Sequence, residues 1–349
     1  MIIFLTIVAF ILIFGLLIFV HEFGHFFMAK RQGIKVEEFA FGYPPRIWSK
    51  KYKETLYSIN AIPLGGYVRM LGEEDSSNNP RSFSQKSAGA RIKVVIWGVL
   101  MNLITAWLLL TIWFIIVSLI PPQNYAVIAQ VMPNTPAAES DLRAGDIVIG
   151  ANGQKFNESE QVGEFTRSHP GEKIDLTIRR YGENITKQIT LSQDKEAPLG
   201  IIQADAGELE VSTRWWLAPY YAILEMGAFV WATILFIGQL FASIFGAAPS
   251  VAGQVAGPVG IFGLLSQMVS IGWTYVLRFA AILSLIVGVF NILPFPALDG
   301  GKLIFLVYEG ITKRKLVKTK VENIIHIVGF FFLIGLLILV TYHDITTRF

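Results

Sequence analysis

Long apolar runs separated by polar segments dominate the chain. The first run extends from Ile2 to Val20 without a charged residue, and four more lie at about 94–120, 219–245, 276–298 and 324–342. A helix rises about 1.5 Å per residue, so roughly 20 apolar residues can cross the hydrocarbon core of a bilayer. The composition agrees, since 53% of the residues are hydrophobic and only 16% are charged. The pattern predicts a polytopic α-helical membrane protein.

The polar segment 123–210 has a different pattern. Short strand-like stretches alternate there with turns rich in Gly, Asn and Pro. The stretches are Ala126–Val131, Asp146–Ala151, Lys173–Arg179 and Lys187–Leu191, and a helix is expected at Gln161–Arg167. We therefore expect a small α+β domain inserted between membrane helices.

Lysine and arginine are concentrated in two segments. Residues 30–93 hold 12 Lys or Arg against 6 Asp or Glu, and residues 302–320 add 6 more basic side chains. Residues 123–214 instead hold 9 basic and 14 acidic side chains. Because basic loops tend to stay in the cytoplasm, the first two segments are predicted to be cytoplasmic and the inserted domain extracytoplasmic. A basic loop beside membrane spans is a topology signal, and we expect no nucleic acid as a partner.

The strongest chemical signal is His21-Glu22-Phe23-Gly24-His25, where the first apolar run ends. Ionisable side chains in such a segment are costly and therefore indicate a function. On a helix His21 and His25 lie one turn apart on one face, where both can bind one metal ion, and Glu22 lies beside them. His-Glu-x-x-His on a helix is the pattern of zinc metalloproteases, with the glutamate as general base. Because the chain has no cysteine, any metal must be bound by nitrogen and oxygen.

A catalytic zinc normally has three protein ligands and one open position, so this motif lacks one ligand. Asp299 is the best candidate, because it follows an apolar run at the end that should face the cytoplasm. The alternative is that Asp299 only caps a helix starting at Gly300. Glu309, Glu322 and His326 are rival ligands, but none lies at such an abrupt change from apolar to polar sequence.

The order of crossings tests this choice of ligand. Asp299 meets the histidines only if its span ends at the cytoplasmic face, and a single crossing by 219–245 would place it on the other side. We therefore expect about four transmembrane helices, two within 1–120 and two within 273–349. Residues 215–272 would then be a peripheral, membrane-associated segment, unless 219–245 is paired with a second crossing.

Parts of the inserted domain resemble a PDZ domain, namely Pro136-Ala137-Ala138, the run Leu142-Arg143-Ala144-Gly145-Asp146-Ile147-Val148, and Asn152-Gly153. PDZ domains bind extended peptides by adding a strand to an exposed sheet edge. Resemblance to the circularly permuted bacterial form implies a peptide-binding loop near Pro198-Leu199-Gly200-Ile201. The alternative is a spacer or steric gate that binds no peptide.

The whole chain resembles the site-2 protease family, and more narrowly its bacterial RseP-like group. The motifs that carry this resemblance are His21–His25, Asn291–Pro294, Leu298–Gly301 and the PDZ-like module between them. Only one such module fits here, where some members have two. The resemblance implies that His21, His25 and Asp299 bind zinc and that Glu22 activates the bound water.

Substrate contacts follow from the same resemblance, and the expected residues are Asn291, Pro294, Gly65, Gly66 and Tyr67. The last three lie in Pro63–Met70, whose glycine pair and alternating apolar residues suggest a short bent strand or hairpin. Similar family members use a membrane-dipping hairpin to clamp extended substrate, although a plain cytoplasmic turn fits this segment nearly as well. Asn102, alone in the second span, is expected to make an interhelical contact.

The expected function is a zinc intramembrane endopeptidase of the bacterial cytoplasmic (inner) membrane. It would cut single-pass membrane proteins already shortened by a site-1 protease, in regulated intramembrane proteolysis. By resemblance the substrates are anti-sigma factors or remnant signal peptides, and the lipid bilayer is the other partner. Two alternatives are a membrane-anchored PDZ adaptor, which would tolerate loss of His21, and a metal transporter with the histidines along an ion path.

Overall fold

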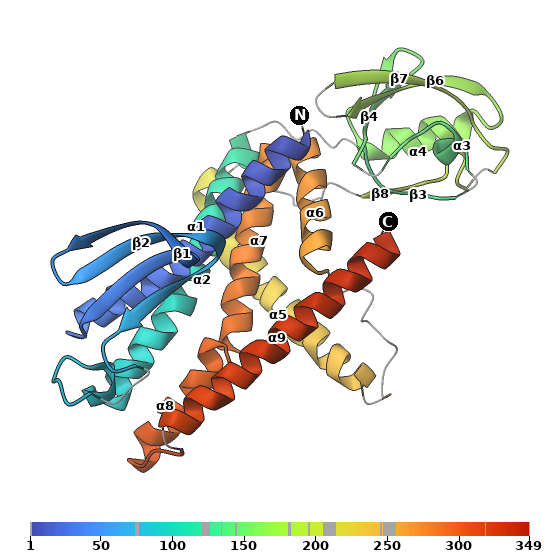
Figure 1. Ribbon diagram of the computed structural model, residues 1–349. Coiled ribbons are helices and arrows are strands. Elements are labelled where there is room, and N and C mark those ends of the chain that lie inside the picture. Colours follow the sequence, from blue (N-terminus) through green and yellow to red (C-terminus); the bar gives the residue numbers. More distant parts are fainter. Residues whose placement is uncertain are drawn as a thin grey trace. The chain divides into compact units, whose positions relative to one another are not determined.

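The computed structural model describes residues 2–73, 77–119, 126–133, 135–143, 145–180, 183–194, 196–204, 214–244, 246, 256–317 and 319–348 (Figure 1). The ends of the inserted segment at 123–125 and 205–210, and Ala144 of its PDZ-like motif, lie outside these residues. By contact density the chain divides into two compact units. One comprises residues 1–6, 110–221 and 262–279, and the other residues 7–109, 222–261 and 280–349.

Long apolar helices confirm a polytopic helical membrane protein with an inserted β region. Within the described residues, five are long and apolar enough to cross a membrane: α1 (Ile2–Arg31), α2 (Ala88–Leu119), α5 (Ala218–Ile244), α7 (Trp273–Ile292) and α9 (Thr319–Arg348). Two shorter helices are α6 (Pro258–Ile271) and α8 (Asp299–Thr312), and short 3₁₀ turns η1 (Phe83–Gln85) and η2 (Trp215–Leu217) precede α2 and α5. Length and composition admit α5 as a span, so its peripheral position stays a prediction.

A long antiparallel hairpin follows α1. It consists of β1 (Val36–Tyr52) and β2 (Thr55–Met70), paired from Val36 opposite Met70 to Tyr52 opposite Thr55, with several register shifts. Its base packs into a core with α1, α2 and α8. The core residues are Met28, Ala29, Ile34, Val36, Phe39, Val68, Met70, Phe83, Val94, Val95 and Leu306. The hairpin is therefore fixed to the helices that carry the metal-binding motif.

One buried carboxylate, that of Glu38, holds the hairpin's two strands together. Glu38 is 3% exposed and accepts hydrogen bonds from Ser58 Oγ at 2.7 Å and Arg46 Nη2 at 2.6 Å. Burial alone would raise the pKa of Glu38, but the bonds from Ser58, Arg46 and Tyr67 outweigh it and hold the pKa below its ordinary value. The carboxylate therefore stays charged and paired.

The inserted domain contains an antiparallel sheet with the strand order β7-β6-β4-β3-β8, and the short strand β5 pairs with β4. The strands are β3 (Ala126–Val131), β4 (Ile147–Ala151), β5 (Gln154–Lys155), β6 (Lys173–Arg180), β7 (Glu183–Thr190) and β8 (Ile201–Ala204). Helices α3 (Pro136–Glu139) and α4 (Ser159–Ser168) complete it. Its core includes Ile128, Val148, Phe156, Val162, Leu176 and Leu199, so the domain has an apolar centre of its own.

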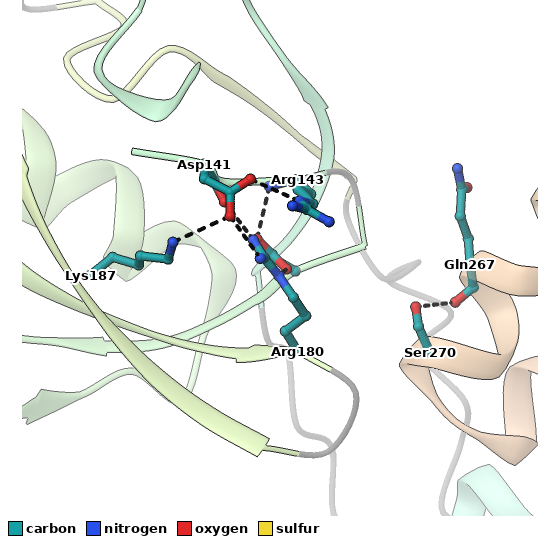
Figure 2. Close-up of polar contacts among 7 residues, drawn as sticks. Asp141, Arg143, Arg180, Lys187, Gln267 and Ser270 are labelled. Carbon is teal, nitrogen blue, oxygen red and sulfur yellow. Dashed lines mark hydrogen bonds and ion pairs between the residues drawn. The ribbon is translucent and has the colours of Figure 1, made fainter. Parts of the chain in front are cut away.

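An ion-pair cluster joins the α3–β4 loop to strands β6 and β7 of this domain, as Figure 2 shows. Arg180 on β6 donates to both carboxylate oxygens of Asp146 at 2.7 Å and to the main-chain oxygen of Asp141 at 2.6 Å. Asp146 is 1% exposed. The more exposed Asp141 carboxylate accepts from Arg143 at 2.9 Å and from Lys187 at 3.4 Å. On α6 the same view shows Ser270 donating to the Gln267 carbonyl, a bond within one helix.

Candidate active site

Three side chains from two distant parts of the sequence converge on one point. His21 and His25 project from the same face of α1, and Asp299 is the first residue of α8. The two histidine Nε2 atoms are 3.2 Å apart, and Asp299 Oδ2 lies 3.2 Å from His21 Nε2 and 3.3 Å from His25 Nε2. All three side chains are at most 15% exposed. Among the described residues this is the one group of three able to hold a metal ion.

The three donor atoms fit a tetrahedral zinc ion. Zinc bonds to nitrogen and oxygen are about 2.0–2.1 Å long, so neighbouring ligands of a tetrahedral ion lie roughly 3.3 Å apart. The observed edges of 3.2 to 3.3 Å match that spacing. Asp299 Oδ2 is buried without a hydrogen-bond partner among the described atoms, as expected of a ligand atom. Three ligands leave a fourth position for water, which is the arrangement of catalytic rather than structural zinc sites.

Two glycines let α1 and α2 approach closely behind the histidines. A Cβ on Gly24 would overlap the main-chain carbonyl of Trp97 on α2. A Cβ on Gly98 would overlap the imidazole of His25. The glycine inside the His-Glu-Phe-Gly-His motif therefore has a steric role, because only a residue without a side chain allows this helix contact.

A tight connection between α7 and α8 places Asp299 beside the two histidines. Ala297 has a positive φ of 78°, and its N–H donates to His326 Nδ1 on α9 at 2.9 Å. A Cβ on Gly300 would overlap the carbonyls of Ile292 and Leu293, and one on Gly301 the carbonyl of Phe295. The paired glycines after Asp299 are thus required by the tight fold of this connection.

The structure separates Asp299 from its rivals. Leu298, not Asp299, is the N-cap residue of α8, so Asp299 lies inside the helix with its carboxylate beside the histidines. Glu309 is paired with Arg91 on α2, Nη2 to Oε1 at 2.5 Å. His326 accepts the Ala297 N–H. Both residues therefore have partners away from the histidine pair.

The hairpin brings its glycine pair to Glu22. A Cβ on Gly66 of β2 would lie 3.0 Å from Glu22 Cγ and 3.2 Å from Ile18 Cγ2, so the strand runs directly against α1 at the glutamate. A Cβ on the preceding Gly65 would overlap the ring of Tyr43, which stacks with Tyr67 at a centroid distance of 6.5 Å. Tyr43 was not foreseen: its register partner is Ile62, and only the folded position of its ring brings it against Gly65.

Asn291 and Pro294 lie on the path to the third ligand. Asn291 is half-buried in the last turn of α7, and Pro294 is exposed in the connection that follows. Their expected contact with substrate stays a prediction. Asn102 is a residue that sequence reasoning assigned only to helix packing: it is fully buried on α2, and its Nδ2 lies 3.3 Å from His21 Nδ1.

Comparisons with known proteins agree with this site. The sequence model of peptidase family M50 matches residues 9–336. A protein of Clostridium acetobutylicum that is named among the zinc metalloproteases is 34% identical over 98% of each chain. The zinc metalloprotease RasP of Oceanobacillus iheyensis is 29% identical and the regulator of sigma-W protease RasP of Bacillus subtilis 27% identical, each over 99% of both chains.

These matches cover the helices, the hairpin and the inserted domain together, so they apply to the whole architecture rather than to one motif. They confirm the expected enzyme, and neither an adaptor nor a transporter is needed to explain the histidines. The chain belongs to peptidase family M50, the zinc metalloendopeptidases of the site-2 protease type.

Proposed function

We propose that this chain cleaves single-pass membrane proteins within the membrane, after a site-1 protease has removed most of their external part. The convergence of His21, His25 and Asp299 within 3.3 Å, with Glu22 on the adjacent position of α1, is the observation that carries the proposal. We assign those three residues as zinc ligands and Glu22 as the general acid and base.

Zinc bound there would lower the pKa of a water molecule and polarise the scissile carbonyl. Glu22 removes the proton of the attacking water and later donates a proton to the leaving amine. The Glu22 carboxylate interacts electrostatically with His25, His21 and Asp299, so it lies close to all three candidate ligands. The carboxylate of Asp299 and the two imidazoles hold the reaction centre fixed on α1 and α8.

A transmembrane helix has to unwind before it can be cut, because its amides are paired internally and its carbonyls are shielded. The hairpin offers an alternative partner for the freed main chain. The contact of Gly66 with Glu22 supports this role, since β2 passes beside the general base. We propose that Gly65, Gly66 and Tyr67 hold an extended substrate there, and that Asn291 and Pro294 contact it from the α7–α8 connection.

We also propose a PDZ-like role for the inserted domain, at the outer face of a bacterial cytoplasmic membrane. Strand β8 is an edge of its sheet, paired with β3 on one side. A groove of about 220 Å³ lies between α4 and β8, lined by Val162, Thr166, Arg167 and residues 196–201 and Gln203. It includes the Pro198–Ile201 loop expected to bind peptide. An extended C-terminus adding to β8 would suit this edge.

The substrate class proposed is anti-sigma factors or remnant signal peptides. One relative carries the name regulator of sigma-W protease, which agrees with a role in controlling a sigma factor. In this proposal the inserted domain either recognises the newly exposed C-terminus or excludes a substrate whose outer domain is still attached. Cleavage of the trimmed substrate but not of the intact one would support both versions.

Glu22→Gln tests the chemistry directly. With purified full-length protein and a trimmed single-pass substrate, we expect the variant to lose cleavage by at least about 100-fold, since proton transfer contributes that much. Zinc content should remain, because Glu22 is not a ligand. Glu225→Gln on α5 is the matched control and should cleave normally. Cleavage by Glu22→Gln at the normal rate would contradict the mechanism.

A further inference from the structure

Each zinc-ligand histidine has a second ring nitrogen, and α2 contacts both of them. His25 Nδ1 lies 2.9 Å from the Val94 carbonyl, and His21 Nδ1 lies 3.3 Å from the Asn102 side chain. Val94, Gly98 and Asn102 are spaced four residues apart and therefore share one face of the helix. The same face thus serves both histidines, with the missing side chain of Gly98 making room for the His25 ring.

The contact between His25 Nδ1 and the Val94 carbonyl determines which ring nitrogen of His25 carries the proton. A carbonyl oxygen can only accept a hydrogen bond, so the neutral His25 ring carries its proton on Nδ1 and leaves Nε2 free to bind a metal. Metal-binding histidines usually donate the other N–H in this way, which fixes the tautomer and the ring orientation. His21 needs an equivalent acceptor.

The Asn102 amide directs its Nδ2 toward His21, and in that orientation Nδ2 donates to His21 Nδ1. A neutral His21 would then carry its proton on Nε2, pointing at His25 Nε2 and Asp299 Oδ2, and could not bind metal through that atom. Asn102 Oδ1, meanwhile, is buried and lacks a hydrogen-bond partner among the described atoms. Oxygen and nitrogen of an amide are interchanged by a simple turn of the group.

We propose that Asn102 acts as the positioning residue of His21, with its amide turned so that Oδ1 accepts a hydrogen bond from His21 Nδ1–H. This arrangement leaves His21 Nε2 unprotonated and directed at the metal, as the Val94 carbonyl does for His25. The turn gives the oxygen a donor and moves the amide nitrogen to the buried position that the oxygen held. The inference deepens the proposed active site and rests on the assignment of His21, His25 and Asp299 as ligands.

The surroundings hold Asn102 in place for this role. It is fully buried, and its main-chain carbonyl accepts a hydrogen bond at 2.8 Å from Ser284 Oγ on α7, which is also fully buried. A Cβ on Gly288, one turn further along α7, would lie 3.6 Å from Asn102 Cβ. Packing of α7 against α2 therefore fixes the position from which the amide reaches His21. Asn102 therefore makes two interhelical contacts, one from its main chain to α7 and one from its side chain to His21 on α1.

Zinc affinity is the property to measure, because it reports on the ligand without requiring turnover. The purified full-length protein would be equilibrated with a competing chelator and its retained zinc quantified. Asn102→Leu keeps the approximate shape but has no acceptor, and we expect it to weaken zinc binding by roughly 10- to 100-fold. Thermal unfolding of the zinc-free proteins shows whether each variant folds, and Asn102→Ala replaces the leucine variant if that one does not.

Asn102→Asp decides the direction of the hydrogen bond. A carboxylate can accept from His21 Nδ1–H but cannot donate to it. If Oδ1 is the functional atom, Asn102→Asp retains zinc close to the wild-type level while Asn102→Leu loses it. Weakening of zinc binding by Asp to the same extent as by Leu would overturn the proposed orientation. Wild-type affinity in Asn102→Leu and Asn102→Ala would overturn the positioning role itself.

Two controls distinguish a failure of the Asn102 proposal from a failure of the metal-site assignment on which it rests. Ser118→Ala removes a hydrogen bond to the Ile115 carbonyl within α2, further along the helix from Asn102, so its zinc affinity should stay near that of the wild type. His21→Ala should abolish stoichiometric zinc binding. If the wild type and His21→Ala hold the same amount of zinc, the metal-site assignment fails, an outcome distinct from failure of the Asn102 proposal alone.

Discussion

At the scale of single residues, the site depends as much on missing side chains as on reactive ones. Gly24, Gly66 and Gly98 each stand where a methyl group would meet another part of the site. Their absence of a side chain lets α2 and β2 come within contact distance of the histidines and of Glu22. Of Phe23 and Gly24, the two residues between Glu22 and His25, the glycine is therefore required by the packing of α1 against α2.

Gly24→Ala tests this requirement. The added methyl has to displace the Trp97 main chain, and overpacking of this kind typically costs about 1–3 kcal/mol of stability. Because Val94, Gly98 and Asn102 move with α2, zinc affinity should fall as well. Gly227→Ala on α5 is the control: nothing lies within 4 Å of its added methyl, and alanine is the better helix former. A thermal melt and the zinc content of both variants check the expectation, which fails if Gly24→Ala matches Gly227→Ala.

At the scale of elements, hydrophobic pattern predicted the helices and the inserted strands well. The stretches Ala126–Val131 and Lys173–Arg179 correspond to β3 and β6, and the expected helix Gln161–Arg167 lies within α4. The hairpin was predicted only over its last part, Pro63–Met70. Strand β1 was missed because most of its second half is exposed and contains Pro44-Pro45, which ordinarily argue against a strand.

The choice of candidate ligands rested on a different signal. His21 and His25 are joined by helical spacing, and Asp299 by a requirement for one more ligand at the same membrane face. Asn102 had no comparable signal. The sequence of an apolar span does not show whether its amide side chain contacts another helix or a metal-binding histidine. Only the packing of α1 against α2 shows that Asn102 contacts His21.

Arg180 on β6 holds the α3–β4 loop of the inserted domain in place through its bonds to Asp141 and Asp146. It is 11% exposed and pairs with the almost fully buried Asp146, so Arg180→Met leaves an uncompensated buried carboxylate. Breaking a buried pair in this way costs about 3–5 kcal/mol. Limited proteolysis of residues 126–204 should accelerate in this variant. Arg143→Met, which removes a pair with both side chains more than half exposed, should have little effect. Equal protease resistance of the two variants would contradict this ranking.

At the scale of the whole molecule, the metal site constrains how the chain crosses the membrane. His21 in the C-terminal half of α1 and Asp299, the first residue of α8, are in contact, so we expect these two parts of the chain at the same membrane face. Because α2 returns to the opposite face, α7 has to start there, and the chain between α2 and α7 makes an even number of crossings. If α5 crossed, α6 would have to return, yet its 14 residues span only about 21 Å of a core roughly 30 Å thick.

We therefore expect α5 to lie along the outer face rather than to cross alone, and the absence of cysteine makes this directly measurable. Single cysteines at three exposed positions, Ser49→Cys on β1, Ser168→Cys on α4 and Gly246→Cys after α5, would each be the only thiol in the protein. An impermeant maleimide applied from outside should label positions 168 and 246 in cells, and position 49 only after the membrane is opened. Labelling at 246 that behaves like 49 would show that α5 crosses, and the return would then have to be made by residues 247–272.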